Sequence, residues 1–491
     1  MPDLFIDGAW SAATAGGRRR ITCPATGETV GEVDEASDAD TRRAIAAAAA
    51  AFADGAGDWP TTAIMERAVR LDRVAAGLRR DKDQIALAEA LDTGKRLVEA
   101  ECDIDDVASV FAHYAAVGQE PASGRIVDTG RAGIDSRIVT EPVGVCSLIT
   151  PWNYPLLQAS WKVAPCLLAG NTFVLKPSEI TPHSTIHLIR LLQEAGLPAG
   201  VGNLVLGTGS GCGEPLSTDP RVDLVSFTGS LAVGRQLMAN AATTVKRVAL
   251  ELGGKNPNIV FADADRDAAL DNALTAVFLH SGQVCSAGAR LLVQQSIAEE
   301  FVDALVDRAR SIRPGTPLDP AAQIGSLTSA GHLAKVEAYV QRGIEEGARL
   351  RCGGRRPENP GLENGFFYLP TVFDNCRAEM HIVQEESFGP VLTAETFATE
   401  QEAIALANDS IYGLAGAVWT SNQAMADRVA ARLRLGTVWI NDYHPYVAQA
   451  EWGGYKQSGI GRELGDHGLA EYQEIKHIWR NCSPAPSGWF S

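Results

Sequence analysis

The sequence predicts an α/β protein in which parallel sheets are covered by helices on both faces. Short apolar strands alternate with helical segments from residue 143 to about residue 227, and a second series of this kind runs from about residue 258 to 430. Strands that are buried on both faces carry continuous apolar runs, and parallel neighbours need a helical crossover. The length of 491 residues and a hydrophobic fraction of 45% allow three domains, or two, with ample core.

The composition excludes several classes of protein. Asp and Glu number 60 against 43 Lys and Arg, and the net charge of −17 opposes binding to nucleic acid or to an anionic membrane. The basic cluster Arg18 to Arg20 is expected to be a solvated loop. No signal peptide or membrane-spanning segment is visible, and nine scattered cysteines without a C-x-x-C pair are typical of a reducing compartment. We therefore expect a cytoplasmic protein.

The first hundred or so residues are expected to be rich in helix. Asp38 and Asp40 precede an alanine-rich run, and a second helical stretch from about Thr61 to Leu91 ends at Asp92-Thr93-Gly94. Residues 125–140 have the turn signals of a hairpin.

The first α/β series contains four expected strands and two expected helices. The strands are 143–150, 172–176, 203–206 and 223–227, and the helices are 160–168 and 182–195. Parallel sheets bind ligands beyond the carboxyl ends of their strands, in the loops that lead to helices. The tail 471–479 is strand-like and lies outside both series, so with the 125–140 hairpin it is a candidate oligomerisation element.

Familiar nucleotide and metal motifs are missing. The glycines between Gly207 and Gly213 form no G-x-G-x-x-G, and residues 229–234 are not followed by the Lys of a P-loop. His183 and His187 are four residues apart on an expected helix, but no third ligand is evident. Both are expected to be ordinary helix residues, and no metal centre is expected.

Six segments, in this order, resemble the NAD(P)-dependent aldehyde dehydrogenase superfamily, and the resemblance covers nearly the whole chain. They are P-W-N-Y-P (151–155), K-P-S-E (176–179), F-T-G-S (227–230), E-L-G-G-K-N (251–256), G-Q-V-C-S-A (282–287) and E-S-F-G-P-V (386–391). The family has a variant dinucleotide fold with the segment F-T-G-S-x-x-x-G, here 227–234, which explains the missing motif.

The resemblance implies a variant Rossmann cofactor domain, an α/β catalytic domain and a small β oligomerisation element. The implied NAD-binding domain is 1–124 with 141–253, the catalytic domain is 254–440, the active-site loop and return to the cofactor domain is 441–470, and the oligomerisation element is 125–140 with 471–491. A homodimer or homotetramer is implied as well.

The resemblance also implies the catalytic residues. Cys285 would attack the aldehyde as a thiolate, and the side-chain amide of Asn153 with the backbone N–H of Cys285 would stabilise the oxyanion. Glu251 would activate the water that hydrolyses the thioester, with Lys162 and Glu463 as a proton-relay pair. The presence of Glu251 favours release of a free carboxylate over acyl transfer to CoA.

The implied cofactor is NAD. Glu179 would face the ribose 2′-hydroxyl and repel the 2′-phosphate of NADP, which remains the alternative. Gly229 and Ser230 would meet the pyrophosphate at a helix N-terminus, and Glu386 and Phe388 would grip the nicotinamide ribose and ring. The other expected cofactor residues are Ile149, Thr150, Pro151, Trp152, Lys176, Ser178, Gly209, Gly213, Phe227 and Leu252. Some relatives bind a monovalent cation such as potassium near residues 92–95, so such a site is a further expectation.

Four aromatic residues are expected to line the substrate pocket: Tyr154, Trp161, Tyr446 and Trp452. Tyr154 and Trp161 are seven residues apart and share one face of a helix begun by Pro155. The four rings would form a cage for a trimethylammonium group. Glu451 near the entrance would steer a cation toward it.

The stretch 444–465 is also similar to the betaine-aldehyde-oxidising branch of the family. The expected reaction is therefore oxidation of betaine aldehyde to glycine betaine, with other aminoaldehydes as weaker substrates. An apolar pocket for neutral aliphatic or aromatic aldehydes is the alternative. A non-catalytic binding or structural role is a remoter one.

Overall fold

The computed structural model describes residues 2–119 and 124–490, and this part of the chain forms two large sheets and two small ones. The first large sheet has the strand order β19-β11-β10-β7-β8-β9-β1-β2. Its central strands are parallel, whereas β1 and β19 pair antiparallel to their neighbours. The strands are β1 (Leu4–Ile6), β2 (Ala9–Ser11), β7 (Val145–Ile149), β8 (Thr172–Lys176), β9 (Gly202–Leu204), β10 (Leu224–Gly229), β11 (Arg247–Leu252) and β19 (Gly459–Ile460).

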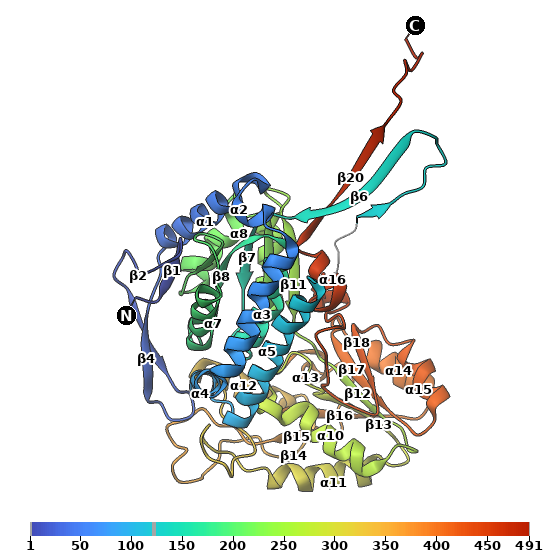
Figure 1. Cartoon of the computed structure of the whole chain (residues 1–491). Coiled ribbons are helices and arrows are strands. Elements are labelled where there is room, and N and C mark those ends of the chain that lie inside the picture. The colour runs from blue at the N-terminus through green and yellow to red at the C-terminus, as the bar shows by residue number, and fades with distance from the viewer. Residues whose placement is uncertain (1, 120–123, 491) are drawn as a thin grey trace.

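The second large sheet has the order β14-β15-β16-β13-β12-β17-β18 and is parallel except for the edge strand β14. Its strands are β12 (Pro257–Val260), β13 (Arg290–Gln294), β14 (Arg349–Cys352), β15 (Thr371–Asp374), β16 (Val391–Phe397), β17 (Ala415–Trp419) and β18 (Thr437–Ile440). The two sheets and their helices occupy the upper and lower parts of Figure 1. The predicted α/β architecture is confirmed.

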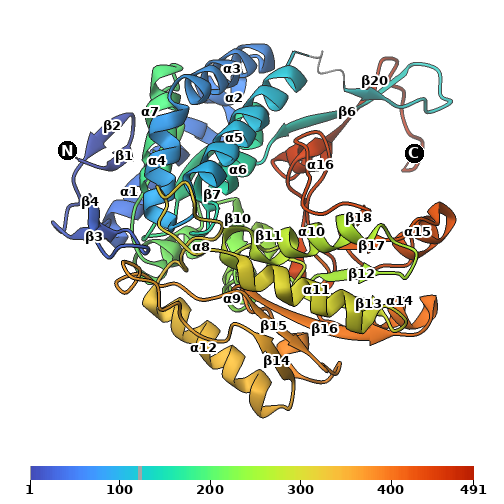
Figure 2. The same ribbon diagram turned by 90° about the horizontal axis from the view of Figure 1, so that it is seen from below.

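Helices pack around both sheets, as the view from below shows (Figure 2). Those in the same half of the molecule as the first sheet are α1 (Asp38–Phe52), α2 (Asp58–Thr61), α3 (Ile64–Arg80), α4 (Lys82–Thr93), α5 (Leu97–Val117), α6 (Pro155–Ala169), α7 (His183–Glu194), α8 (Glu214–Thr218), α9 (Leu231–Ala241) and α16 (Gly465–Ala470). Those in the second half are α10 (Arg266–Phe278), α11 (Ala298–Ser311), α12 (Ala330–Glu345), α13 (His381–Gln384), α14 (Glu400–Asn408) and α15 (Gln423–Ala430). Every residue of α6 is buried, so this helix lies inside the molecule. In the described residues no helix is long and apolar enough to cross a membrane.

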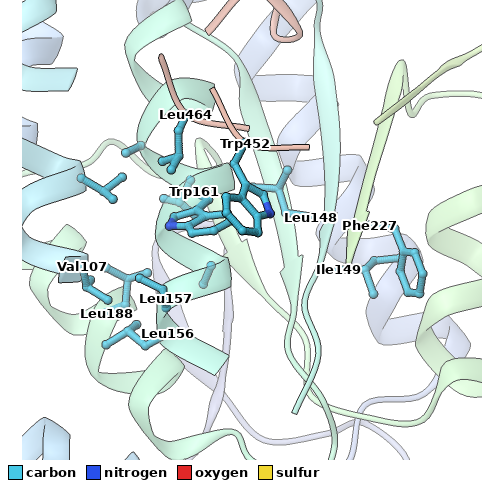
Figure 3. Close-up of a cluster of buried hydrophobic side chains, with 14 of the residues drawn as sticks. Val107, Leu148, Ile149, Leu156, Leu157, Trp161, Leu188, Phe227, Trp452 and Leu464 are labelled. Carbon is cyan, nitrogen blue, oxygen red and sulfur yellow. The ribbon is translucent and has the colours of Figure 1, made fainter. Parts of the chain in front are cut away.

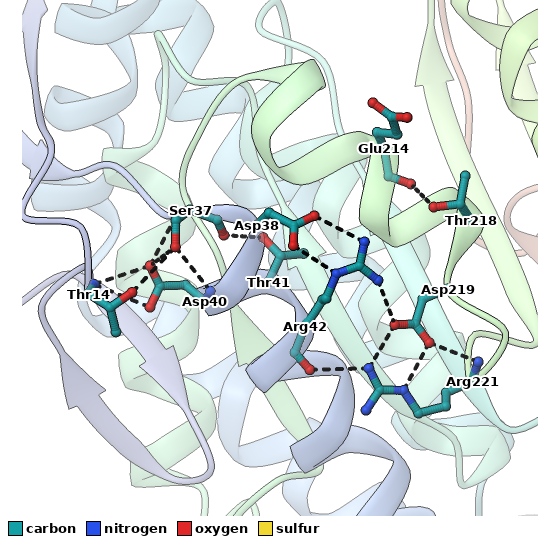
Figure 4. Close-up of polar contacts among 10 residues, drawn as sticks. All are labelled: Thr14, Ser37, Asp38, Asp40, Thr41, Arg42, Glu214, Thr218, Asp219 and Arg221. Atoms are coloured by element: carbon teal, nitrogen blue, oxygen red, sulfur yellow. Dashed lines mark hydrogen bonds and ion pairs between the residues drawn. The ribbon is translucent and has the colours of Figure 1, made fainter.

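The start of α1 is fixed by polar contacts (Figure 4). The hydroxyl of Ser37 accepts the N–H of Asp40 at 3.2 Å, and the carboxylate of Asp40 accepts the N–H of Ser37 at 3.0 Å, which is a capping box worth about 1 kcal/mol. Arg42 then reaches Asp219, which Arg221 also binds at 2.7 Å. These contacts tie the N-terminal helix to the loop after α8.

The N-terminal region differs from the expectation in two places. Residues 18–22 are not a solvated loop but strand β3 (Arg18–Thr22), which pairs antiparallel with β4 (Thr29–Asp34). Arg18 forms ion pairs with Glu32 and Asp34, and opposite charges on paired strands favour a sheet. The expected helix over 61–91 is two helices, α3 and α4, which meet at Asp81.

Helices α4 and α6 both end at a glycine. Gly94 and Gly170 cap them with φ of 78° and 98°, a left-handed conformation that side chains disfavour. The predicted stop at Asp92-Thr93-Gly94 is thus confirmed.

A three-stranded sheet, here called the arm, projects from the body of the molecule (Figure 1). It consists of β5 (Arg125–Ile126), β6 (Ile134–Pro142) and β20 (Gln473–Asn481) in the order β20-β6-β5. The hairpin and the strand-like tail are both present, and the tail pairs with the hairpin from Gln473↔Pro142 to Asn481↔Ile134. Met1, residues 120–123 and Ser491, which the expected domain ranges include, lie outside the described residues.

Candidate active site

Two cavities meet at Cys285. Cavity A, of about 750 Å³, lies beyond the carboxyl ends of β10 and β11, and cavity B, of about 550 Å³, lies against α5 and α6. Gln158, Cys285 and Trp452 line both cavities. The thiol can therefore be approached by one ligand from each side.

The loop that carries Cys285 has an unusual backbone. His280, Ser281 and Gly282 follow α10 with φ of 46°, 57° and 72°, three successive residues in the left-handed region. A Cβ at position 282 would lie 2.1 Å from the carbonyl oxygen of Gly389, so only glycine permits this contact. Because Gly282 has no side chain, the loop of Cys285 packs closely against the segment that carries Glu386 and Phe388.

Two asparagine side chains hold the same loop. The amide of Asn153 donates a hydrogen bond to the carbonyl of Gln283 at 2.8 Å. The amide of Asn256 donates to the carbonyls of Cys285 at 2.8 Å and Ala287 at 3.0 Å. Because an amide nitrogen has two hydrogens, Asn153 keeps one donor for a ligand in cavity A, whose wall it forms.

The thiol of Cys285 is protonated at rest. Burial, followed by the negative charges of Glu251 and Glu386, raises its pKa to about 12. Nucleophilic attack therefore requires a base that takes the thiol proton.

Glu251, Lys162 and Glu463 form a buried charged group. The Nζ of Lys162 lies 2.5 Å from Oε1 of Glu463 and 3.1 Å from the hydroxyl of Ser226. Burial, and then the charge of Glu463, raises the pKa of Glu251 well above its usual value. Oε1 of Glu251 and Oε2 of Glu463 are buried without a hydrogen-bond partner in the part of the chain that the structure describes. Glu251 also lines cavity A, so a carboxyl with the properties of a general base faces the thiol's cavity.

Several expected cofactor residues lie on the wall of cavity A. These are Pro151, Trp152, Gly229, Ser230, Leu252, Glu386 and Phe388. Ser230 caps α9 by accepting the N–H of Val233, so that this helix begins at the cavity. The rings of Trp152 and Phe388 meet edge to face with centroids 5.2 Å apart.

The other expected cofactor residues do not line cavity A. Ile149 and Phe227 are buried side by side in the core (Figure 3). Lys176 and Glu179 face each other at 3.8 Å, next to Ile180, which does line the cavity. The rest of this group, which is absent from the cavity wall, is Thr150, Ser178, Gly209 and Gly213.

All four expected substrate aromatics line cavity B. Trp161, Tyr446 and Trp452 form one cluster with ring centroids 5.4, 5.9 and 6.4 Å apart, and Figure 3 shows the two indoles side by side. Tyr154 lines the same cavity, and the Nζ of Lys95 lies 4.2 Å from its ring centroid. Three rings in mutual contact and the ring of Tyr154 thus line this cavity, and the four-ring cage stays a prediction.

Acidic residues on α5 line cavity B, and the sequence reasoning missed them. They are Glu99, Asp103 and Asp106, with Arg96 beside them. The hydroxyl of Tyr446 donates to Asp106 at 2.7 Å, and Lys95 binds Asp103 at 2.5 Å. Glu451 is the carboxylate that was predicted near the entrance of the substrate pocket. It pairs with His467 at 2.8 Å and lines neither cavity. The spacing of three residues between Asp103 and Asp106 on a helix was the available signal, since it places both on one face.

Other cavity residues were also missed. His332 contacts the carbonyl of Phe388 at 2.7 Å on the side of cavity A, and His444 approaches the hydroxyl of Ser286 at 3.3 Å in cavity B. Burial lowers the pKa of His444 to about 4, so this imidazole is neutral. Neither His332 nor His444 belongs to one of the six sequence segments.

The expected cation site stays a prediction. The carboxylate of Asp92 is bound by the N–H of His183 at 3.0 Å and by its Nδ1 at 2.7 Å. Among the described residues, no group of three or more His, Cys, Asp or Glu side chains is arranged to hold a metal ion.

Residues 10–478 match the sequence model of the aldehyde dehydrogenase family, and the chain belongs to this family. It is 55% identical to betaine aldehyde dehydrogenase of Bacillus subtilis over 99% of each chain. It is 44% identical to aminoaldehyde dehydrogenase 2 of Zea mays, over 99% of this chain and 97% of the relative. A crystal structure of betaine aldehyde dehydrogenase from Staphylococcus aureus in complex with NAD⁺ superposes with a TM-score of 0.97 at 49% identity, over 99% of this chain and 96% of that one. The resemblance found in the six sequence segments is thereby confirmed, and with it the fold.

Proposed function

We propose that this protein oxidises betaine aldehyde, or a related aminoaldehyde, to its carboxylate with NAD through a thioester on Cys285. The observation that carries this proposal is the position of Cys285 between an acidic aromatic cavity and a second cavity at a helix N-terminus. The relatives named above as betaine aldehyde and aminoaldehyde dehydrogenases support the choice of substrate.

In the proposed reaction, the thiol proton of Cys285 passes to water in the cavity, and the sulfur attacks the aldehyde carbon from the junction of the cavities, so that the C=O bond opens to an oxyanion. The aldehyde hydrogen would then leave as a hydride to NAD, and the thioester would remain on Cys285. The free amide hydrogen of Asn153 and the backbone N–H of Cys285 stabilise the oxyanion. Glu251 takes the proton of the attacking water in the second half of the reaction, and Lys162 and Glu463 carry that proton away. Acyl transfer to CoA remains less favoured, because Glu251 provides a base for hydrolysis.

The walls of cavity A fit NAD. Gly229 and Ser230 lie at the N-terminus of α9, where free backbone N–H groups favour the pyrophosphate. Glu386 and Phe388 offer an acceptor for the nicotinamide ribose hydroxyls and a ring for the nicotinamide. NAD bound in cavity A would supply the hydride acceptor. Glu179 favours NAD over NADP, and the S. aureus relative was crystallised with NAD⁺.

Cavity B suits a cationic substrate. Arg96 lies 3.2 Å from Glu99 and Lys95 lies 2.5 Å from Asp103. Among the described residues, Asp106 is left without a cationic partner and makes this wall acidic. The cluster of Trp161, Tyr446 and Trp452 (named above) supplies π-faces, each worth about 1–2 kcal/mol to a desolvated cation. A neutral aldehyde would use the rings but gain nothing from the carboxylates, so we place it second.

Replacing Trp452 with alanine is expected to lower kcat/KM for betaine aldehyde about 10-fold more than kcat/KM for the uncharged isostere 3,3-dimethylbutanal. The difference corresponds to the loss of one cation–π contact of ~1.4 kcal/mol. Trp452→Phe keeps a ring and should retain most of the preference. Because Trp452 also lines cavity A, the KM for NAD is measured in parallel. Preference of the wild type for the neutral aldehyde, or equal losses for both substrates, would refute the cationic pocket.

We infer that the two large sheets correspond to two domains. The first sheet, with residues 1–124 and 141–253, would form the cofactor domain, since β10 ends at Gly229 on cavity A. Residues 254–440 would form the catalytic domain, and 441–470 the return loop. We also infer a cytoplasmic location, which the nine free cysteines support.

The arm is proposed to join copies of the chain, so that wild-type protein should have two or four times the chain mass of 52.1 kDa in light scattering. Within the described residues, one edge of β20 has no strand partner, and this strand exposes Ile475, at 72%, with Ile478 and Trp479. The double substitution Ile475→Lys and Ile478→Lys should lower the mass. Val245→Lys, at an exposed site outside the arm, is the matched control. A wild-type mass of one chain would contradict this role.

A further inference from the structure

A carboxylate on α5 binds the loop that leads to Cys285. Oε1 of Glu99 accepts the backbone N–H of His280 at 2.9 Å, although the two residues are 181 positions apart in the sequence. His280 is the first of the three residues with a left-handed backbone described above. Its carbonyl accepts a hydrogen bond from the side-chain amide of Gln283 at 3.2 Å. The backbone of His280 is thus held on both sides, and Glu99 is the partner that comes from outside the loop.

Glu99 is itself fixed at the start of α5. Its Oε2 accepts the N–H of Arg96, the residue at the N-cap of the helix, at 3.0 Å, and the guanidinium of Arg96 lies 3.2 Å from Oε1. Contacts of this kind hold a glutamate side chain against the first turn of its own helix. The oxygen that binds His280 is therefore placed by α5 and not by the loop.

The conformation of the loop explains why it requires such an anchor. A left-handed backbone is unfavourable for residues that carry a side chain, and both His280 and Ser281 adopt it. Ser281 is held by its hydroxyl, which donates to the carbonyl of Gly325 at 2.8 Å. His280 is 1% exposed, so without Glu99 its N–H would be buried with neither water nor a carboxylate to accept it.

Glu99 also lines cavity B, where a free carboxylate would attract a cationic substrate. The carboxylate of Glu99 is not free in this sense. Each of its oxygens accepts a backbone N–H, and Arg96 balances its charge. Asp106, on the same wall, has no cationic partner among the described residues and is better suited to that task. The contacts of Glu99 are directed at the protein.

We propose that Glu99 is a positioning residue for the nucleophile, which holds the backbone of residues 280–282 and thereby the sulfur of Cys285 at the junction of the two cavities. The inference rests on the proposed function of Cys285. A displacement of about 1 Å at a reacting centre can lower a rate by ~100-fold. Because the same loop serves every substrate, loss of this contact should slow attack on charged and neutral aldehydes alike.

The test compares Glu99→Gln with Glu99→Asp in the rapid NADH burst, measured by stopped-flow absorbance at saturating NAD. Glutamine keeps an oxygen acceptor at the same reach but has no charge, whereas aspartate keeps the charge on a shorter side chain. The burst rate of Glu99→Gln should stay within about 3-fold of the wild type, and that of Glu99→Asp should be about 10–100-fold lower. The factor should be the same for betaine aldehyde and 3,3-dimethylbutanal.

Two variants on the same helix serve as comparisons. Glu101→Ala removes a carboxylate that lies outside both cavity walls and should leave the burst rate unchanged. Asp106→Asn should lower kcat/KM for betaine aldehyde alone. The Kd of NAD for the Glu99 variants, from calorimetric titration, should equal that of the wild type, because Glu99 does not line cavity A.

The reverse order of the two variants would overturn the proposal. A normal burst in Glu99→Asp with a slow burst in Glu99→Gln, or a loss confined to betaine aldehyde, would show that Glu99 acts through its charge. Wild-type burst rates in both variants with a lowered Tm would show a merely structural role. Absence of aldehyde oxidation by the wild type would instead refute the proposed function.

Glu99→Ala, which has no acceptor, replaces Glu99→Asp in the comparison if the aspartate variant does not fold. It should show the same slow burst for both aldehydes. Failure of both of these variants to fold would overturn the proposal, because Glu99 would then serve the fold and not the placement of Cys285.

Discussion

Cys285→Ala is expected to lower aldehyde oxidation by at least about 10³-fold, because no covalent intermediate can form without the thiol. NAD affinity should change little, since cavity A keeps its other walls. The measurement is NADH formation with betaine aldehyde, together with calorimetric titration of NAD. Cys482→Ala, which removes an exposed thiol just after the arm, is the matched control and should retain full activity.

The environment of Cys285 makes this result diagnostic. Its thiol carries a proton at neutral pH, because burial and two nearby carboxylates oppose a thiolate. A random buried cysteine would have the same raised pKa but would not line two cavities. Substantial turnover by Cys285→Ala would therefore show that another group attacks the aldehyde.

Glu251→Gln is expected to release about one NADH per site in a rapid burst and then to turn over about 10²–10³-fold more slowly than the wild type. Hydride transfer precedes hydrolysis, so the variant should stall as the thioester. Stopped-flow absorbance separates the two phases. Glu299→Gln, at an exposed position on α11, should behave as the wild type.

The pH dependence of the same reaction tests the base directly. Burial and Glu463 raise the pKa of Glu251, and a base acts only after losing its proton. The steady-state rate of the wild type should thus increase as pH rises through this pKa, and Glu251→Gln should lose that increase. Equal loss of the burst and of the steady state would contradict a role in deacylation.

Local sequence patterns predicted the central sheet well. The predicted strand 172–176 has the same bounds as β8. A strand buried on both faces has a continuous apolar run, so it can be predicted without knowing which strands it pairs with. The N-terminal strands were missed since each is short and its pairing is non-local. Arg18 to Arg20 become a strand only through acids 12 to 16 residues away on β4.

The sequence predicted those site residues that lie in continuous motifs. It missed those that only the fold brings together. Cys285, Glu251 and Asn153 belong to continuous segments and do lie together around cavity A. The acidic wall of cavity B lies on α5, whereas Tyr446 is 340 residues from its partner Asp106. No local pattern connects such positions. Tyr154 lines cavity B, but no local pattern predicted the buried ammonium of Lys95 beside its ring.

The junction of the two cavities has a consequence for redesigning this enzyme. Among the described residues only Gln158, Cys285 and Trp452 belong to both walls, so substrate choice and cofactor choice are largely separable traits. A library that varies α5 positions such as Val98 and Cys102 would reshape the entry for new aldehydes without altering a cofactor contact. Trp452 is the exception among the aromatic side chains, and a designer seeking a wider substrate range would keep it fixed and begin with Tyr446.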